Sequence, residues 1–363
     1  MKVAMAAGTM IATAWCGIIA AQLIAGGTLL SGVFSLDFKL SLAIVSVVFV
    51  MYTFWGGQLS VIRTDSWQLV LFVGGLLVSL GFLLWSQDSG PSLWQNVPRE
   101  HLCFPVSAHF GWYEVVVFYP LVVGLPYLVG PDIYSRVLCA RNNRVAKRSA
   151  LLAATVVIPL SFLLALFGLL ALSRFPGIAP EAALPKTLNV LVPAGLKGVI
   201  VAGFLGAIMS SADTCLISAS TILSLNVMGP FRQVSTNQHL RFTKAALVAV
   251  GGAAWLIASQ EQGIISSLLL GYTVFVGGVV IPTLASFCRD TIKVTPVGAF
   301  WAIAVGGSTA LLGKIQEGAA MKAILSRAGE AFLQALLGPQ YLSILPIILS
   351  LVIMVGVSRI TRS

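Results

Sequence analysis

The most constraining feature of the sequence is a succession of apolar runs, each long enough to cross a lipid bilayer. A membrane-spanning helix needs ~20 mostly apolar residues, and ten such segments follow one another along the chain. They lie at 3–30, 40–55, 66–85, 113–130, 150–172, 198–223, 245–258, 264–287, 297–312 and 342–357. The sequence therefore predicts an all-α, polytopic membrane protein with about ten transmembrane helices. We expect residues 1–363 to form a single transmembrane domain.

The scarcity of charge excludes other classes of protein. Lys and Arg number 22 and Asp and Glu 12, so charged residues make up 9% of the 363 residues. Soluble domains average about 25%, and so few charges cannot cover a water-exposed surface. The hydrophobic fraction of 58% excludes a disordered chain. The net charge is +10, but the basic residues form short clusters between apolar runs. This pattern indicates loops at a membrane face rather than a nucleic-acid partner.

The distribution of basic residues predicts the orientation. With the amino terminus inside, the inner connectors hold 14 Lys and Arg and the outer ones 8, which together make the 22 of the chain. The positive-inside rule then places both termini in the cytoplasm, and the predicted location is the plasma membrane, as in a bacterial inner membrane. Two outer connectors are long, 86–112 and 313–341, and the second contains a helix-capable stretch at 319–337. The first apolar run is longer than the ~7–15 residues of a signal-peptide core, so we interpret it as a retained helix.

Nothing in the sequence predicts a cofactor or an enzymatic reaction. The five cysteines are odd in number and give no disulfide framework. The three histidines lie in polar connectors, whereas a transmembrane haem needs histidines at membrane depth. The zinc-protease, nucleotide-binding and dinucleotide-binding motifs are absent from the sequence. We therefore expect neither a cofactor nor a metal other than the ion discussed below.

The sixth apolar segment carries an unusual set of polar residues. At 100° per residue, one face of a helix over 198–223 presents an alanine and five hydroxyls, and Asp213 lies about 60° to one side of Ser210. The residues that share this face are Ala207, Ser210, Ser211, Thr214, Ser218 and Thr221.

Two interpretations of this face compete. Small and hydroxyl residues let membrane helices approach closely, which explains the serines alone. That interpretation leaves Asp213 unexplained, because an ionised carboxylate at that depth is costly without a cation or a donor beside it. Hydroxyls with one or two carboxylates suit a hard cation such as Na⁺, and no thiolate or imidazole favours a transition metal. The pattern favours a sodium-binding face.

Asp65 is a second acidic candidate near a span. At the start of the third segment it has the position of an N-cap, which would satisfy free backbone N–H groups and the helix dipole. A partner at the same height, such as Asp213, would instead make it a cation ligand. By position alone, the cap is the better interpretation.

The fourth segment is interrupted. Pro120, Gly124, Pro126, Gly130 and Pro131 fall close together in it, and a milder series of glycines with a proline occurs in the eighth segment. A single proline indicates only a kink, but this density is typical of the broken helices with which transporters expose backbone oxygens to a substrate. A channel would instead need a repeated filter loop. The pattern favours a secondary transporter.

Several motifs together resemble the sodium/solute symporter family, which includes proline, pantothenate, sugar and sialic-acid symporters. The stretch YTFWGG at 52–57 followed by RTDSWQ at 63–68 resembles one signature of that family. AIMSSADT at 207–214 resembles its core motif, RVLCAR at 136–141 resembles the end of its broken helix, and Gln22 matches a Gln of the family. The resemblance runs from about residue 13 to the carboxyl end.

The resemblance implies an inverted-repeat bundle of five plus five helices and assigns roles to residues. Ala207, through its carbonyl, would hold the main Na⁺ together with Ser210 and Ser211. Asp65, Asp213 and Thr214 would mark a second cation site that some members have. This role raises Asp65 from a cap to a ligand.

The resemblance also implies sodium-coupled symport of a small organic solute by alternating access, with Na⁺ as the coupling ion and the lipid bilayer as surroundings. Tyr127, Gly130 and Asp132, around the end of the broken helix, are the candidate contacts of the solute. Gly130-Pro131-Asp132 departs from the family pattern, so the identity of the solute does not carry over. The resemblance starts at the third core helix, so the chain has no counterpart of the first two. The alternative is a non-transporting, N-terminally truncated fragment or a membrane sensor module.

Overall fold

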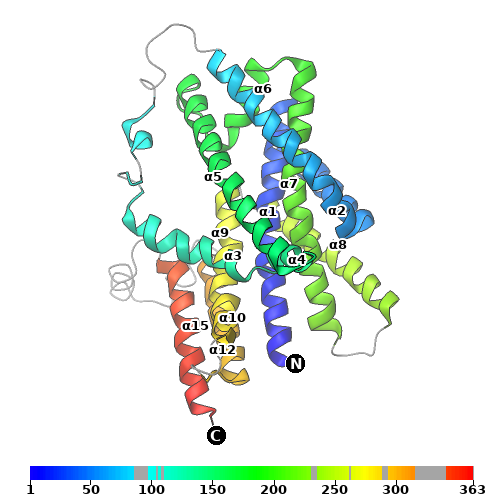
Figure 1. The fold of residues 1–363 in the computed structure, drawn as a ribbon, viewed down its shortest axis with the longest axis vertical. Helices are drawn as coiled ribbons and strands as arrows, with labels where there is room; N and C mark the ends of the chain where they lie inside the picture. The colour runs from blue at the N-terminus through cyan, green and yellow to red at the C-terminus, as the bar shows by residue number, and fades with distance from the viewer. Residues whose placement is uncertain are drawn as a thin grey trace. The chain divides into compact units, whose positions relative to one another are not determined.

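The structure is a computed structural model that describes residues 1–85, 97–103, 105–107, 110–229, 235–260, 263–287, 293–314 and 341–362 (Figure 1). These residues are almost entirely helical and include no β-strand. Ten helical segments are long and apolar enough to cross a membrane, which confirms the predicted all-α, ten-span architecture. They are Lys2–Phe34, Phe38–Gly57, Thr64–Trp85, Glu114–Leu138, Asn143–Arg174, Ala194–Val227, Thr236–Gln260, Ile264–Phe287, Pro296–Lys314 and Tyr341–Ile360.

The chain divides into two compact units. The first comprises Met1–Ala21, Phe110–Ile133 and Cys215–Ser363, and the second comprises Gln22–His109 and Tyr134–Thr214. Helices α1 (Lys2–Phe34) and α7 (Ala194–Ile222) each contribute residues to both units. That residues 1–363 act as one transporter domain stays a prediction. The predicted interfacial helix at 319–337 lies outside the described residues, as do His109 and Cys288.

In the second unit, α2 (Phe38–Trp85) consists of two helices joined at Gly57. Gly57 has φ 61° and ψ −177°, a conformation that costs glycine little and other residues much. The hydroxyl of Tyr52 lies 2.8 Å from that of Thr64. Residues this far apart in a straight helix would be separated by about 18 Å, so the chain folds back at Gly57. The YTFWGG and RTDSWQ stretches therefore meet across one bend.

The second half of α2 packs closely against α7. A Cβ added to Gly203 would lie 2.8 Å from the backbone carbonyl of Leu71, and one added to Gly206 would lie 3.0 Å from Cγ of Gln68. The α2 side of the contact also has a glycine, because a Cβ added to Gly75 would lie 3.2 Å from Cγ2 of Ile200 on α7. Small residues of this kind let the backbones of membrane helices approach each other. The contact fixes the height at which polar residues of α2 face polar residues of α7.

An apolar core surrounds this contact and includes a helix that the sequence analysis missed. Leu76, Leu83, Leu170 and Leu188 are buried in one cluster within the second unit. Leu188 belongs to α6 (Ala183–Leu191), which follows a short 3₁₀ turn at Pro180–Ala182 and contacts α2 and α5. Such a helix is too short to span a bilayer, so a search for apolar spans treats it as a connector.

The long helix α5 (Asn143–Arg174) begins before the predicted segment. The side chain of Asn142 accepts a hydrogen bond from the backbone N–H of Val145 at 2.9 Å and caps the helix. The basic residues Arg144, Lys147 and Arg148 therefore lie in its first turns rather than in a loop. The hydropathy of the span cannot reveal this start, because the cap is polar.

The predicted interruption of the fourth segment is present. Two π-helical segments, Glu114–Phe118 and Pro120–Gly124, precede the short helix α3 (Leu125–Val129). Gly130 then takes an extended conformation, with φ −63° and ψ 127°, before α4 (Pro131–Leu138) begins. The eighth segment shows the milder version, as a π-helical segment at Val276–Val280 between α9 (Ile264–Phe275) and α10 (Ile281–Phe287).

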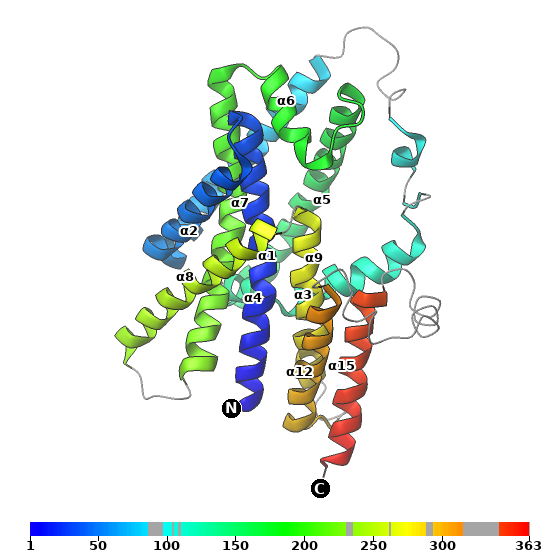
Figure 2. The ribbon, with the colours of Figure 1, turned by 180° about the vertical axis from the view of Figure 1, so that it is seen from behind.

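The first unit is also organised by close helix contacts. Helix α12 (Pro296–Lys314) lies beside α15 (Tyr341–Ile360), as both Figure 1 and Figure 2 show. The amino-terminal half of α1 meets α9 where a Cβ on Gly17 would lie 2.9 Å from the backbone nitrogen of Gly271. Nearby, the rings of Trp15 and Phe275 pack edge to face with centroids 4.7 Å apart. The same unit contains α8 (Thr236–Gln260) and the π-helical segment Leu223–Met228.

The contact between α2 and α7 predicts that Gly203 tolerates no side chain. Gly203→Ala places a methyl group against the backbone of Leu71, and overpacking of this kind costs about 1–3 kcal/mol. We expect a lower thermal unfolding midpoint for the purified protein in detergent. Gly198→Ala is the matched control, because a Cβ there meets nothing within 4 Å and alanine favours the helix. Equal midpoints for the two variants would contradict the close contact.

Candidate functional site

One turn of α7 carries four of the six residues predicted for the two cation sites. Asp213 is fully buried, with 0% of its surface exposed, whereas Ser210 and Thr214 are half-buried and Ser211 is exposed. Ala207 is half-buried one turn earlier on the helix. The polar face predicted from the sequence is therefore divided in the structure. Part of it is packed against neighbouring helices, and the Ser211 hydroxyl is left open.

Asp65 meets this turn of α7 directly. The hydroxyl of Ser210 donates a hydrogen bond to Oδ1 of Asp65 at 2.6 Å. The other carboxylate oxygen, Oδ2, lies 3.4 Å from Nη2 of Arg136 and forms an ion pair with it. The same Nη2 atom lies 2.5 Å from the hydroxyl oxygen of Thr214. Asp65, Arg136, Ser210 and Thr214 thus form one network, which we call the Asp65 cluster.

Asp213 has a different set of neighbours. The hydroxyl of Thr53, on the first half of α2, bonds to Oδ1 of Asp213 and also lies 2.8 Å from the backbone carbonyl of Phe49. The other oxygen of Asp213, Oδ2, is buried and has no hydrogen-bond partner among the described residues. An unpaired buried carboxylate oxygen is costly unless a donor or a cation satisfies it. A cation or a proton donor placed beside this oxygen would remove that cost.

The structure does not support the N-cap interpretation of Asp65. Within the part of the chain that is described, its carboxylate accepts from the side chains of Ser210 and Arg136 rather than from backbone N–H groups at the start of a helix. Asp65 and Asp213 lie on either side of the contact between α2 and α7. Their roles as cation ligands stay predictions.

Sequence reasoning missed two members of the arrangement, Thr53 and Arg136. Both belong to motifs that were quoted, YTFWGG and RVLCAR, but neither residue received a role. Thr53 lies in an apolar run where a threonine is unremarkable, and it is 160 residues from Asp213 in the sequence. Arg136 follows the broken helix and reads as one of a basic cluster at a membrane face. Only their contacts reveal what they do.

The chemistry of the arrangement suits a hard monovalent cation. Its candidate ligands are carboxylate, hydroxyl and backbone carbonyl oxygens, which hard cations prefer. In the described ranges, no group of three or more His, Cys, Asp and Glu side chains lies close enough together to hold a metal ion. A divalent metal centre of the usual kind is therefore not seen there. One or two carboxylates with several hydroxyls match the charge of Na⁺ better.

The three candidate solute contacts lie at the end of the interrupted helix. The hydroxyl of Tyr127, an exposed residue of α3, lies 3.3 Å from that of Tyr272 on α9. Gly130 separates α3 from α4, and Asp132 is in the first turn of α4. A Cβ on Gly130 would lie 2.7 Å from Oδ1 of Asp132, so the carboxylate folds back over the break. Tyr272 is a neighbour that the sequence alone did not indicate.

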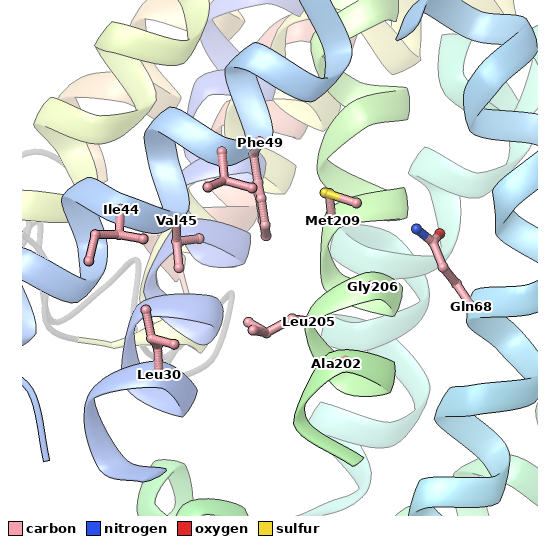
Figure 3. A pocket seen from close by; sticks show the side chains of 10 residues that line it. Leu30, Ile44, Val45, Phe49, Gln68, Ala202, Leu205, Gly206 and Met209 are labelled. Carbon is pink, nitrogen blue, oxygen red and sulfur yellow. The ribbon is translucent and has the colours of Figure 1, made fainter. Parts of the chain in front are cut away.

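An apolar cavity of about 350 Å³ lies in the second unit (Figure 3). The residues that line it come from α1, α2 and α7 and are Leu30, Ile44, Val45, Val48, Phe49, Gln68, Ala202, Leu205, Gly206 and Met209. Its polar member is Gln68, whose Oε1 is buried and has no hydrogen-bond partner among the described residues. The cavity includes neither carboxylate of the site, so we assign no function to it.

Comparison with known proteins gives one family. A family model described as the sodium:solute symporter family matches residues 1–306. Among curated proteins, sodium/glucose cotransporter 4 of Homo sapiens is 28% identical over 348 residues, covering 82% of this chain and 50% of its own. Sodium/myo-inositol cotransporter 2 of Mus musculus is 26% identical over 290 residues, covering 68% and 43%. The chain spans about half the length of the curated relatives it matches.

A solved structure gives the same fold. The chain matches a Na⁺-coupled sialic acid symporter in its substrate-bound outward-open state with a TM-score of 0.72 and 17% sequence identity. The match covers 98% of this chain and 74% of the other. At this identity, the likeness shows a shared fold of helices and not a shared solute.

The bond between Thr53 and Asp213 predicts an effect on stability. Thr53→Val keeps the shape of the side chain but leaves both oxygens of the buried carboxyl without a donor among the described residues, which costs about 1–3 kcal/mol. We expect a lower thermal unfolding midpoint in detergent. Thr53→Ser keeps the hydroxyl and should recover most of the loss. A valine variant as stable as the wild type would show that Asp213 does not depend on Thr53.

Proposed function

Because the chain belongs to the sodium:solute symporter family, we propose that it carries out sodium-coupled symport of a small organic solute by alternating access. The family is one of transporters, so the prediction that the chain is not an enzyme agrees with this membership. The observation that carries the proposal is the pairing of Asp65 with Ser210 beside the buried, half-satisfied Asp213. Carboxylates at membrane depth are expensive and mark ion pathways.

The main Na⁺ would bind at the exposed edge of the polar face of α7. Its ligands would be the backbone carbonyl of Ala207 and the hydroxyls of Ser210 and Ser211. The exposure of Ser211 supports this proposal, because its oxygen is free to exchange water for a cation. Ser210 would connect this site to Asp65, to which its hydroxyl already donates.

A second cation would bind between Asp65, Asp213 and Thr214. The unpaired oxygen of Asp213 supports this site, because a cation would satisfy an acceptor that no described donor reaches. Such a cation also offsets the charge of two carboxylates placed near each other in an apolar span. Sodium is the coupling ion in this proposal, and the transporter needs no further cofactor.

Coupling would arise because the cation and the solute favour the same conformation. A ligand shifts a conformational equilibrium only by its different affinity for the two states, and the coupling of two ligands is reciprocal. The interruption at Gly130 offers a place for such a change. It separates α3, which carries Tyr127, from α4, which carries Asp132 and Arg136.

The solute would contact Tyr127, Gly130 and Asp132. Backbone oxygens freed at the break, a tyrosine ring and a carboxylate together suit a solute rich in hydroxyl groups. The names of two curated relatives support the same choice, since they refer to glucose and myo-inositol. Glucose and myo-inositol are therefore the first solutes to test.

The location and orientation that we propose for the chain rest on its ten apolar helices and on the distribution of its charges. We place the chain in the plasma membrane with both termini in the cytoplasm, because the basic residues concentrate in the connectors of that side. The basic cluster at the start of α5, with Arg144, Lys147 and Arg148, would then face the cytoplasm.

The alternative function is a non-transporting membrane module. A chain that binds Na⁺ but moves no solute would support this alternative. Uptake of labelled solute into proteoliposomes distinguishes the two.

The proposal predicts that Ser211→Ala weakens the binding of Na⁺ and so raises the Na⁺ requirement of uptake. In proteoliposomes with an inward Na⁺ gradient, the Na⁺ concentration for half-maximal uptake should rise about fivefold, the effect of losing an interaction of ~1 kcal/mol. Ser220→Ala is the matched control, because the Ser220 hydroxyl bonds to the Leu216 carbonyl of its own helix. An unchanged Na⁺ requirement for Ser211→Ala rejects the site, and no Na⁺-driven uptake by the wild type favours the non-transporting alternative.

A further inference from the structure

A guanidinium group already holds the oxygens proposed for the second cation. Nη2 of Arg136 lies 2.5 Å from the hydroxyl oxygen of Thr214 and 3.4 Å from Oδ2 of Asp65. These are two of the three residues assigned to that site. Arg136 is therefore placed where the positive charge of a bound ion would be.

The hydrogen bonds of the cluster show that Arg136 and a metal ion need the same lone pairs. The single hydroxyl proton of Thr214 is donated to the backbone carbonyl of Ser210 at 3.0 Å. The Thr214 oxygen therefore presents its lone pairs to Arg136, as a ligand presents them to a cation. Oδ1 of Asp65 is bonded by Ser210, which leaves Oδ2 for the positive charge.

The position of Arg136 lets it leave this site. Its side chain is 50% exposed, whereas that of Asp65 is 23% exposed. It belongs to the last turn of α4, the short helix that starts directly after the extended residue Gly130. A long, half-exposed arginine can turn its charged head into water at little cost. The ion pair is therefore a reversible contact rather than a fixed part of the core.

We propose that Arg136 is a tethered competitor of the second cation, which occupies the Asp65 and Thr214 oxygens when the ion is absent and swings out when it binds. The inference rests on the proposed function, because it assumes the second cation site. Asp65 then faces a positive charge in both states. The cluster never leaves that carboxylate unpaired, which would be strongly unfavourable in a partly buried position.

Competition of this kind lowers the apparent affinity for the cation. The apparent affinity equals the intrinsic affinity multiplied by the fraction of molecules in which Arg136 has left the site. A half-exposed ion pair makes that fraction a minority without making it negligible. Removal of the arginine should therefore strengthen cation binding, which is opposite to the effect expected from removing a ligand.

Thermal unfolding of the purified chain in detergent tests this inference without requiring transport. The midpoint is measured as NaCl replaces choline chloride at constant ionic strength, since a ligand of the folded state raises it. For Arg136→Gln, the Na⁺ concentration giving half of the stabilisation should fall about three- to fivefold. Its midpoint in choline alone should drop below that of the wild type and recover in saturating NaCl. Arg136→Lys keeps the charge, so its half-stabilising Na⁺ concentration should lie between those of the wild type and Arg136→Gln.

The controls distinguish the inference from the function on which it rests. Arg144→Gln removes the same charge from the first turn of α5, outside the Asp65 cluster, and should leave the Na⁺ midpoint unchanged. A wild-type chain without Na⁺-specific stabilisation rejects the cation sites and the competition together. The cation sites stand if Ser211→Ala weakens the stabilisation by Na⁺. If Arg136→Gln then leaves that stabilisation unchanged, or weakens it too, the competition alone is overturned. A loss of stability in both Arg136 variants that NaCl fails to restore would show a purely structural ion pair and also overturns it.

Discussion

The burial of carboxylates among apolar helices is the constraint on which the rest of this structure depends. Asp213 is fully buried on a helix of high hydropathy, and Asp65 lies at the start of another. Neither is tolerable in such surroundings without donors or positive charge nearby. The hydroxyls of Thr53 and Ser210 and the guanidinium of Arg136 supply part of this compensation. Among the described residues no donor reaches Oδ2 of Asp213, and this is the oxygen that we propose a cation satisfies.

Backbone packing brings these groups to the same height. The bend at Gly57 folds α2 back on itself. Thr53, in the first half of α2, and Asp65, in its second half, therefore both contact α7. Gly203 and Gly206 let the second half of α2 lie against α7 without intervening side chains. The glycines thus act on the site at a distance, because they set the separation of the helices that carry the polar residues.

The interrupted helix connects the cation region to the region proposed for the solute. Tyr127 precedes the extended residue Gly130, and Arg136 follows it on α4. Gly130 is therefore the point in the chain where the segment proposed to contact the solute joins the helix that carries Arg136. Energetic linkage between its two ligands is what a symporter requires.

The sequence by itself determined the architecture and singled out the polar helix face on which we place the candidate site. Hydropathy gave all ten spans, and the density of proline and glycine predicted the break before α4. The polar face of α7 was visible because helical periodicity is local, and a carboxylate in an apolar run is conspicuous. These features depend on residues a few positions apart.

Only the tertiary structure decided which partners the polar residues have. Thr53 bonds to Asp213 across 160 residues and Arg136 to Thr214 across 78, and no periodicity encodes such pairs. The same holds for α6, a helix too short for a hydropathy search, whose Leu188 is buried against α2 and α5 only in the folded chain. Composition reveals that a charge lies in an apolar span, but its compensation depends on distances that packing alone sets.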